Sequence, residues 1–294
     1  MIACIQMKLS ADDYRTQETF EDKIFDLMKR TRQQAGKGQL LVVFPEHIGT
    51  FCLLCNESAE VWSSGSFSKA VSKIIKAHFL SISGYRLFRR QSWIRSLALV
   101  KSGEAERIYL STFSKAAREF GAWIVAGSGM TRWGQTNTVY NSSPVFNPFG
   151  ELVHRQHKVH LVDMEGPEGL DIAPAPVNYL SAVESPFGRL GIAICLDAFK
   201  EDVWNRLQDL DVKILIQPSA NNGPWNEWQK EDWLNSSYKA VYSQKRFPLA
   251  INPMLVGGMW ELEFEGQSSI ISTSGYVSRA QTHNEEEILV SSLV

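Results

Sequence analysis

Three side chains of complementary chemistry stand at the ends of stretches that are predicted to be β-strands. Cys195 closes the apolar stretch 190–195, Glu46 follows the stretch 39–44, and Lys158 ends a strand that leaves a turn signal. Strand ends can meet at one edge of a sheet, where ligands bind. A thiol, a carboxylate and an ammonium together supply a nucleophile, a proton carrier and a positive charge. Each also has a structural interpretation, since a free Cys is often buried in a core and a lone Glu or Lys is usually solvated.

The order and context of these residues resemble a known family. The blocks 44–46, 158–161 and 194–197 are similar to the three catalytic blocks of the nitrilase superfamily, the carbon–nitrogen hydrolases, in the family's order Glu, Lys, Cys. The resemblance covers 1–294 apart from a stretch at about 61–105, where members usually have a shorter link.

The resemblance and the residue types imply a mechanism. Cys195 attacks an amide carbonyl and forms a thioester, Glu46 carries the proton, and Lys158 stabilises both the thiolate and the developing oxyanion. The backbone N–H of Leu196 is expected to assist at the oxyanion. Glu165 resembles an additional glutamate that orients substrate in many relatives, and Glu168 is its competitor. No step requires a metal or an organic cofactor, so we expect neither.

The substrate class is predicted from the residues that follow the cysteine. Asp197, two positions after Cys195, resembles amidase-type branches, although Leu196 departs from the aromatic or acidic residue common at its position. We expect hydrolysis of a small linear amide or N-carbamoyl compound. The alternatives are nitrile hydrolysis, acyl transfer to another acceptor, and a non-catalytic scaffold that binds partners through 61–105.

The alternation of strands and helices predicts an α/β fold. From the pattern alone the expectation is an open sheet with helices on both faces, in a single domain. The resemblance implies instead a four-layer α-β-β-α sandwich and a homodimer or higher homo-oligomer. The predicted strands are 2–7, 39–44, 122–126, 138–146, 151–158, 178–184, 188–195, 213–217, 247–252, 268–272 and 287–294, and the predicted helices are 20–33, 105–120, 198–207 and 225–244.

The stretch 61–105 has a charge unlike that of the remainder. It holds eight Lys and Arg against one acid, which gives +7, whereas 22 basic and 31 acidic residues elsewhere give −9. The favoured interpretation is a helical cap or oligomer interface, with an apolar stripe packed inward and lysines outward. Contact with an anionic membrane is the second interpretation, and nucleic acid is the third. The stripe consists of Phe67, Val71, Ile74 and Phe79, and the lysines are Lys69, Lys73 and Lys76.

Composition narrows the remaining classes. The 294 residues carry a net charge of −2, which gives no overall sign of nucleic-acid binding, and no run of 18 apolar residues predicts a membrane span. The first residues predict a strand and not a leader peptide. Four cysteines do not make a disulfide framework, and Cys52 and Cys55 have no second pair to complete a zinc site. We therefore expect a reducing, cytoplasmic setting.

Overall fold

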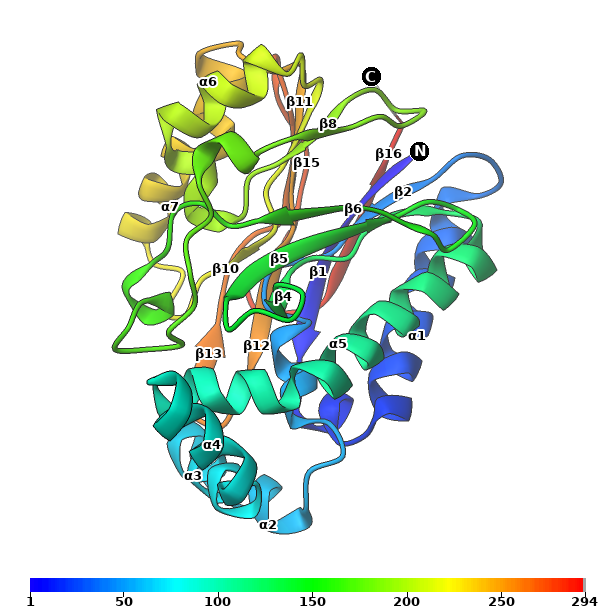
Figure 1. The fold of residues 1–294 in the computed structure, drawn as a ribbon. Helices are drawn as coiled ribbons and strands as arrows, with labels where there is room; N and C mark the ends of the chain where they lie inside the picture. The colour runs from blue at the N-terminus through cyan, green and yellow to red at the C-terminus, as the bar shows by residue number, and fades with distance from the viewer. Residues whose placement is uncertain (293–294) are drawn as a thin grey trace.

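The computed structural model describes residues 1–292, apart from the side chain of Arg89. Within them the strands form two sheets that lie face to face (Figure 1). The last predicted strand, 287–294, is present up to Ser291, and residues 293–294 lie outside the described part.

The first sheet contains ten of the described strands. Its main path runs β10 (Ser219–Ala220), β12 (Met254–Met259), β1 (Ile2–Leu9), β2 (Leu41–Val43), β3 (Trp123–Val125), β5 (Val139–Phe146) and β4 (Gly129–Arg132). Three strands pair beside this path: β13 (Leu262–Phe264) with β12, β16 (Glu287–Ser291) with β1, and β6 (Leu152–His157) with β5.

The second sheet contains six of the described strands. Their order is β15 (Gly275–Arg279), β14 (Ser269–Ser272), β11 (Leu249–Asn252), β9 (Ile214–Ile216), β8 (Leu190–Ile192) and β7 (Ala182–Val183). The central strands β8, β9 and β11 run parallel, so the polypeptide leaves each of them at the same edge of the sheet.

The alternation of side chains along β1 shows how the layers are built. Ile2 and Cys4 point into the core between the two sheets, where they join Leu190 and Ile192 of β8. Ala3 and Ile5 point to the opposite face and pack under α1 (Gln17–Ala35) and α5 (Trp93–Phe120). On the far side, α6 (Glu201–Asp209) covers the second sheet. The fold is therefore an α-β-β-α sandwich, and the open single sheet predicted from the pattern alone is wrong.

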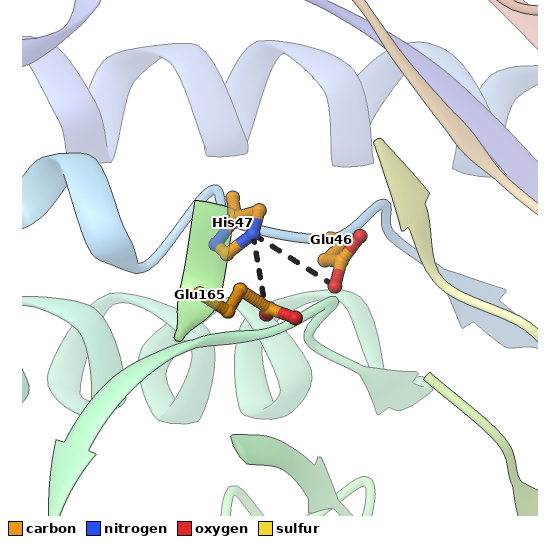
Figure 2. A group of neighbouring side chains, drawn as sticks. All are labelled: Glu46, His47 and Glu165. Atoms are coloured by element: carbon orange, nitrogen blue, oxygen red, sulfur yellow. Dashed lines mark ion pairs between the residues drawn. The ribbon is translucent and has the colours of Figure 1, made fainter. Parts of the chain in front are cut away.

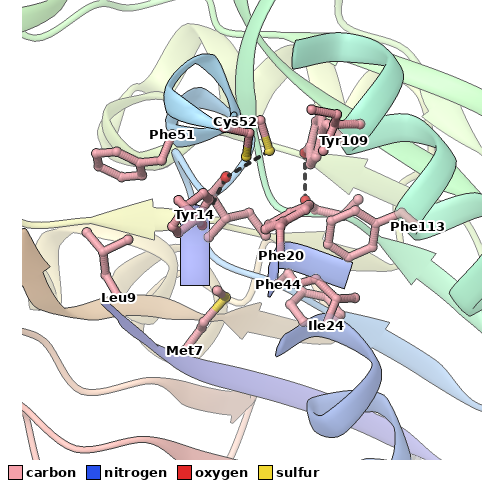
Figure 3. Packing of buried hydrophobic residues seen from close by; sticks show 14 of the residues in the cluster. Met7, Leu9, Tyr14, Phe20, Ile24, Phe44, Phe51, Cys52, Tyr109 and Phe113 are labelled. Carbon is pink, nitrogen blue, oxygen red and sulfur yellow. Dashed lines mark hydrogen bonds between the residues drawn. The ribbon is translucent and has the colours of Figure 1, made fainter. Parts of the chain in front are cut away.

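The core beneath α1 and α5 also fixes the loops near the predicted catalytic residues. Phe20, Phe44 and Phe113 pack edge to face in it, as Figure 3 shows. The buried Tyr14 hydroxyl donates to the carbonyl of Ile48 at 3.0 Å, and the Tyr109 hydroxyl donates to the carbonyl of Ala126 at 2.6 Å. Two tyrosines thus hold the backbone that follows the neighbouring parallel strands β2 and β3.

Three predicted elements differ from the structure. The helix predicted over 105–120 begins at Trp93, so the boundary placed at residue 105 falls inside one continuous helix. The helix predicted over 225–244 consists of α7 (Glu227–Trp233) followed by a π-helix (Leu234–Ser243) with a non-helical residue at Ser236. The strand predicted over 178–184 is paired only over Ala182–Val183, because a 3₁₀ turn (Val177–Tyr179) precedes it.

The basic stretch folds as α2 (Ala59–Trp62), α3 (Phe67–Ala77), α4 (Phe79–Arg89) and the first turns of α5. Val71 and Ile74 are buried in the core cluster beside α5, whereas Phe79 is 52% exposed because α3 ends before it. Two of the cations pair with acids of the main body, Lys101 with Glu57 at 2.7 Å and Arg95 with Asp171 at 2.9 Å. Over residues 1–292, none of the helices combines the length and apolarity that crossing a bilayer requires.

Candidate active site

Glu46 lies at the edge of the first sheet, three residues beyond the end of β2. The chain passes close behind it, because a Cβ on Gly127 would lie 1.9 Å from the carbonyl oxygen of Pro45. Only glycine therefore fits at residue 127, where φ is also +69°. His47, the next residue, has φ of +65° and donates its backbone N–H to Ser128 Oγ at 3.2 Å. The Glu46 loop is thus held in one strained conformation.

Lys158 directly follows β6, and hydrogen bonds from both neighbouring segments fix it. Its N–H donates to the carbonyl of Asn141 in β5 at 2.9 Å. The next two backbone N–H groups, of Val159 and His160, donate to the carboxylate of Asp197 at 3.1 and 2.7 Å. Asp197 therefore joins the Lys158 segment to the Cys195 segment.

Cys195 stands three residues beyond β8 with φ of +50°, and its N–H donates to the carbonyl of Pro218 at 2.9 Å. It opens a short 3₁₀ helix (Cys195–Phe199), and α6 begins only at Glu201. The helix predicted over 198–207 therefore begins three residues later than expected, because the 3₁₀ helix precedes it. Leu196 lies in the first turn of the 3₁₀ helix, where backbone N–H groups have no partner within the helix.

The structure brings the predicted charged residues together. The ammonium of Lys158 lies 2.8 Å from Glu46 Oε1 and 2.7 Å from Glu165 Oε2. The side-chain amide of Asn141 donates to Glu46 Oε1 at 2.9 Å and to Glu165 Oε1 at 2.8 Å. All three charged groups are at most 1% exposed. Glu165 thus belongs to this cluster, whereas its competitor Glu168 is exposed on the loop beyond it.

The charges of the cluster set the protonation state of the thiol. Burial raises the pKa of Cys195, the carboxylate of Glu46 raises it further, and Lys158 opposes this only in part. The pKa of the thiol is therefore raised above its ordinary value in the free site, whereas the sequence predicts that Lys158 stabilises the thiolate. Burial alone would lower the pKa of Lys158, but Glu46, Cys195 and Glu165 raise it above its ordinary value. Lys158 is a permanent positive charge.

Two residues of the site escaped the sequence analysis. Asn141 bridges the two carboxylates, and His47 Nε2 lies 3.8 Å from Glu46 Oε1 and 3.7 Å from Glu165 Oε1 (Figure 2). For His47 the available signal was its place directly after the predicted block 44–46, whereas Asn141 lies inside the predicted strand 138–146 and far in sequence from all three blocks. The contact of His47 Nδ1 with Thr50 Oγ1, at 3.1 Å, fixes the ring.

Two carboxylates and an imidazole this close also form a possible cation site. Ligand atoms of Glu46, His47 and Glu165 all lie within 4.8 Å of one another. The ammonium of Lys158, however, already contacts both carboxylates at 2.7–2.8 Å. A metal ion would have to share these oxygens with a buried cation, so the residues present do not fit one.

Comparison with known proteins gives the family to which this fold and its buried charged cluster belong. The family model described as carbon–nitrogen hydrolase matches residues 1–294. The chain therefore belongs to the carbon–nitrogen hydrolase family, as the resemblance of its three blocks indicated.

Among curated proteins the relatives include amidases. Deaminated glutathione amidase of Bos taurus is 32% identical over 120 residues, which cover 38% of this chain and 36% of that protein. An omega-amidase of Xenopus laevis is 27% identical over 186 residues, which cover 60% of this chain and 63% of that protein. The chain thus spans about a third of the length of the first of these relatives.

Solved structures show the same fold at low sequence identity. A carbon–nitrogen hydrolase from Helicobacter pylori G27 has a TM-score of 0.68 at 17% identity, covering 97% of this chain and 86% of that one. Nit3 of Saccharomyces cerevisiae, described as a member of branch 10 of the nitrilase superfamily, has a TM-score of 0.64 at 18% identity, with 98% and 88% covered. These likenesses support the sandwich architecture.

Proposed function

We propose that this protein hydrolyses a small linear amide or N-carbamoyl compound through a thioester on Cys195. The observation that carries the proposal is the buried ammonium of Lys158, held between Glu46 and Glu165 and electrostatically coupled to the Cys195 thiol. The amidases among its relatives support this substrate class. The nitrile and acyl-transfer alternatives use the same three groups.

In the acylation step the neutral thiol attacks the amide carbonyl as its proton moves to Glu46. A carbon–sulfur bond forms, and the negative charge that develops on the carbonyl oxygen is stabilised by Lys158 and the N–H of Leu196. Glu46 then donates the same proton to the leaving nitrogen as the carbon–nitrogen bond breaks. The products are a thioester on Cys195 and free ammonia or amine.

In the second step water replaces the amine. Glu46 accepts a proton from the water molecule as its oxygen attacks the thioester carbonyl. The carbon–sulfur bond breaks, the sulfur recovers its proton from Glu46, and the carboxylic acid leaves. Glu46 accepts and donates protons in this scheme, so the neighbouring Lys158 must keep its own proton. The raised pKa of Lys158 favours this charged form.

Glu165 has a positioning role in this scheme. It accepts from Lys158 on one oxygen and from Asn141 on the other. Burial would raise the pKa of Glu165, but the charge of Lys158 and these hydrogen bonds lower it. Glu165 therefore stays ionised, keeps Lys158 in place, and leaves Glu46 free to exchange its proton.

The proposal is tested by intact-mass detection of an acyl adduct after exposure to a panel of amides, N-carbamoyl compounds and nitriles. We expect an adduct whose mass matches the acyl part of an amide, and none on Cys195→Ala, which should still unfold cooperatively near the wild-type temperature. Turnover by Cys195→Ala equal to that of the wild type would contradict the assignment of the nucleophile. Absence of adduct and of turnover with every panel member would favour the scaffold alternative.

Three further proposals concern the whole molecule. We infer that 1–294 is a single catalytic domain with 61–105 as an accessory element, because α5 continues from this stretch into the main core. We also propose a homodimer, to be tested by analytical ultracentrifugation. A reducing, cytoplasmic setting is proposed because the chemistry needs a free thiol and all four cysteines are unpaired.

A further inference from the structure

A cavity lies between the basic stretch and the main body, next to the catalytic cluster. Its volume is about 690 Å³, within the range of about 300–1,000 Å³ that is typical of small-molecule sites. Helix α3 and the start of α5 form one wall, and the segment around β13 forms another. The residues that define it best are His47, Phe67, Ile75, Phe79, Trp93 and Phe264.

The side chains that line this apolar chamber are predominantly apolar. Aromatic and aliphatic side chains make up most of its wall, and they come from α3, α5, β13 and the segments that adjoin them. Besides His47, the ionisable side chains that line it are Lys76 and Glu168. These two residues are exposed and carry opposite charges. An anionic group inside would therefore gain no net positive charge from these two. An uncharged hydrocarbon group would bury its surface against the wall.

The apolar chamber reaches the catalytic cluster through one shared residue, His47. His47 lines it, and the Nε2 atom of this residue is within 3.8 Å of carboxylate oxygens of both Glu46 and Glu165. Met164 also lines it and immediately precedes Glu165. One imidazole ring thus separates the chamber from the catalytic carboxylates.

We propose that the apolar chamber is the subsite for a hydrocarbon substituent of the substrate, so that the preferred substrate is an amide with a medium-length alkyl or aryl group. The inference rests on the proposed amidase function and adds its specificity. The basic stretch would then serve substrate selection, because Phe67, Ile75 and Trp93 all belong to its helices.

The first test is a series of straight-chain primary amides from acetamide to decanamide, with ammonia release as the assay. Burying a methylene group is worth about 0.8 kcal/mol, or about threefold to fourfold in affinity. We expect kcat/KM to rise about 100-fold between acetamide and hexanamide and to level off once the chamber is filled. Succinamate, of similar length but with a terminal carboxylate, should be a poorer substrate than pentanamide.

The second test uses a matched pair of substitutions. Ile75→Gln places an amide group in the chamber, whereas Leu80→Gln makes the same change in type at a residue that is 88% exposed and does not line it. We expect Ile75→Gln to lower kcat/KM for octanamide about tenfold and to change that for acetamide less than twofold. Leu80→Gln should change neither. Phe79→Gln, at the rim, provides a second variant if Ile75→Gln fails to fold.

The results distinguish failure of the chamber proposal from failure of the amidase proposal. If short amides are hydrolysed and acylate Cys195 but chain length has no effect, the chamber proposal is wrong and the amidase proposal stands. A preference for succinamate over pentanamide would also overturn the chamber proposal. If no amide acylates Cys195, the amidase proposal fails. In that case Cys195→Ala still tests the chamber, since octanamide should displace the neutral fluorophore 1-aminoanthracene from it, and no displacement refutes the subsite.

Discussion

Replacing Lys158 by Met should expose how the buried charge cluster is balanced. The substitution keeps most of the length of the stem and removes the ammonium that contacts Glu46 and Glu165. Two carboxylates that are at most 1% exposed then face each other without a cation. Activity should be lost, because neither the oxyanion nor the proton exchange has its positive charge.

The cost to stability can be estimated from the burial of the cluster. Removing one partner of a buried, hydrogen-bonded ion pair costs about 3–5 kcal/mol of unfolding free energy, since a charge is left uncompensated. The remaining carboxylates can reduce this cost by binding one proton between them. That proton is bound in the folded variant and absent from the unfolded chain near neutral pH, so the variant gains stability as the pH falls, by about 1.4 kcal/mol per pH unit.

Urea unfolding followed by tryptophan fluorescence at pH 8 and pH 5.5 measures this effect. The pKa of Glu165 is lowered in the wild type, so the stability that this residue contributes is lost only as the pH falls below the ordinary carboxyl range, outside this interval. We expect a difference of about 3–5 kcal/mol between wild type and variant at pH 8 and a clearly smaller one at pH 5.5. Adding Glu165→Gln to the variant should restore part of the loss at pH 8.

Lys101→Met is the matched control. Lys101 is also buried and pairs with Glu57 and Glu104, but Glu104 is 39% exposed in its side chain and the pair lies outside the catalytic cluster. This variant should lose some stability and keep its activity. An equal loss of stability by Lys158→Met at both pH values, or no recovery in the double variant, would refute the assignment of a strongly coupled pair of carboxylates.

Two further predictions follow from the residues around this cluster. Burial raises the pKa of the Asp197 carboxyl to about 7, although the N–H groups that it accepts from favour the ionised form. The stability that the protonated carboxyl contributes is therefore full at low pH and is lost as the pH rises through 7. The unfolding free energy of Asp197→Asn should therefore increase relative to that of the wild type from pH 4 to pH 8, and a difference independent of pH would contradict this. The kcat of the variant should fall, because the Lys158 and Cys195 segments are less firmly joined. The double charge reversal Lys69→Glu with Lys73→Glu should leave amide turnover unchanged, because these side chains lie outside the chamber lining. Salt-sensitive sedimentation of the wild type with anionic liposomes, lost on reversal, would instead assign the stretch to a membrane.

The parts of the site that the sequence predicted are those that depend on local pattern. Glu46 and Cys195 each follow an apolar run, and Lys158 follows a strand that a turn signal marks. His47 and Asn141 were missed because their roles depend on contacts between segments far apart in the chain, such as the bridge from Asn141 to Glu46.

The fold shows the same division between local and non-local information. Most strands with apolar runs were predicted, but β4, β10, β12, β13 and β15 were missed. In β12, Gly257 and Gly258 interrupt the apolar pattern. The protonation state of Cys195 also could not be predicted, since it reflects burial and the excess of carboxylates around the thiol. The choice between Glu165 and Glu168 needed the fold of the loop that carries both.

Helix α5 joins the wall of the apolar chamber to the support of the Glu46 loop. Its 28 residues span about 42 Å, from Trp93 in the wall of the apolar chamber to Phe120. Midway, the hydroxyl of Tyr109 holds the carbonyl of Ala126, next to the glycine that passes behind the Glu46 loop. A shift of this helix that widens the chamber therefore also moves the support of Glu46, the proposed general base. Substrate selection and proton transfer share one mechanical element, so mutations that remodel the chamber for a larger substituent are expected to carry a cost in catalytic rate.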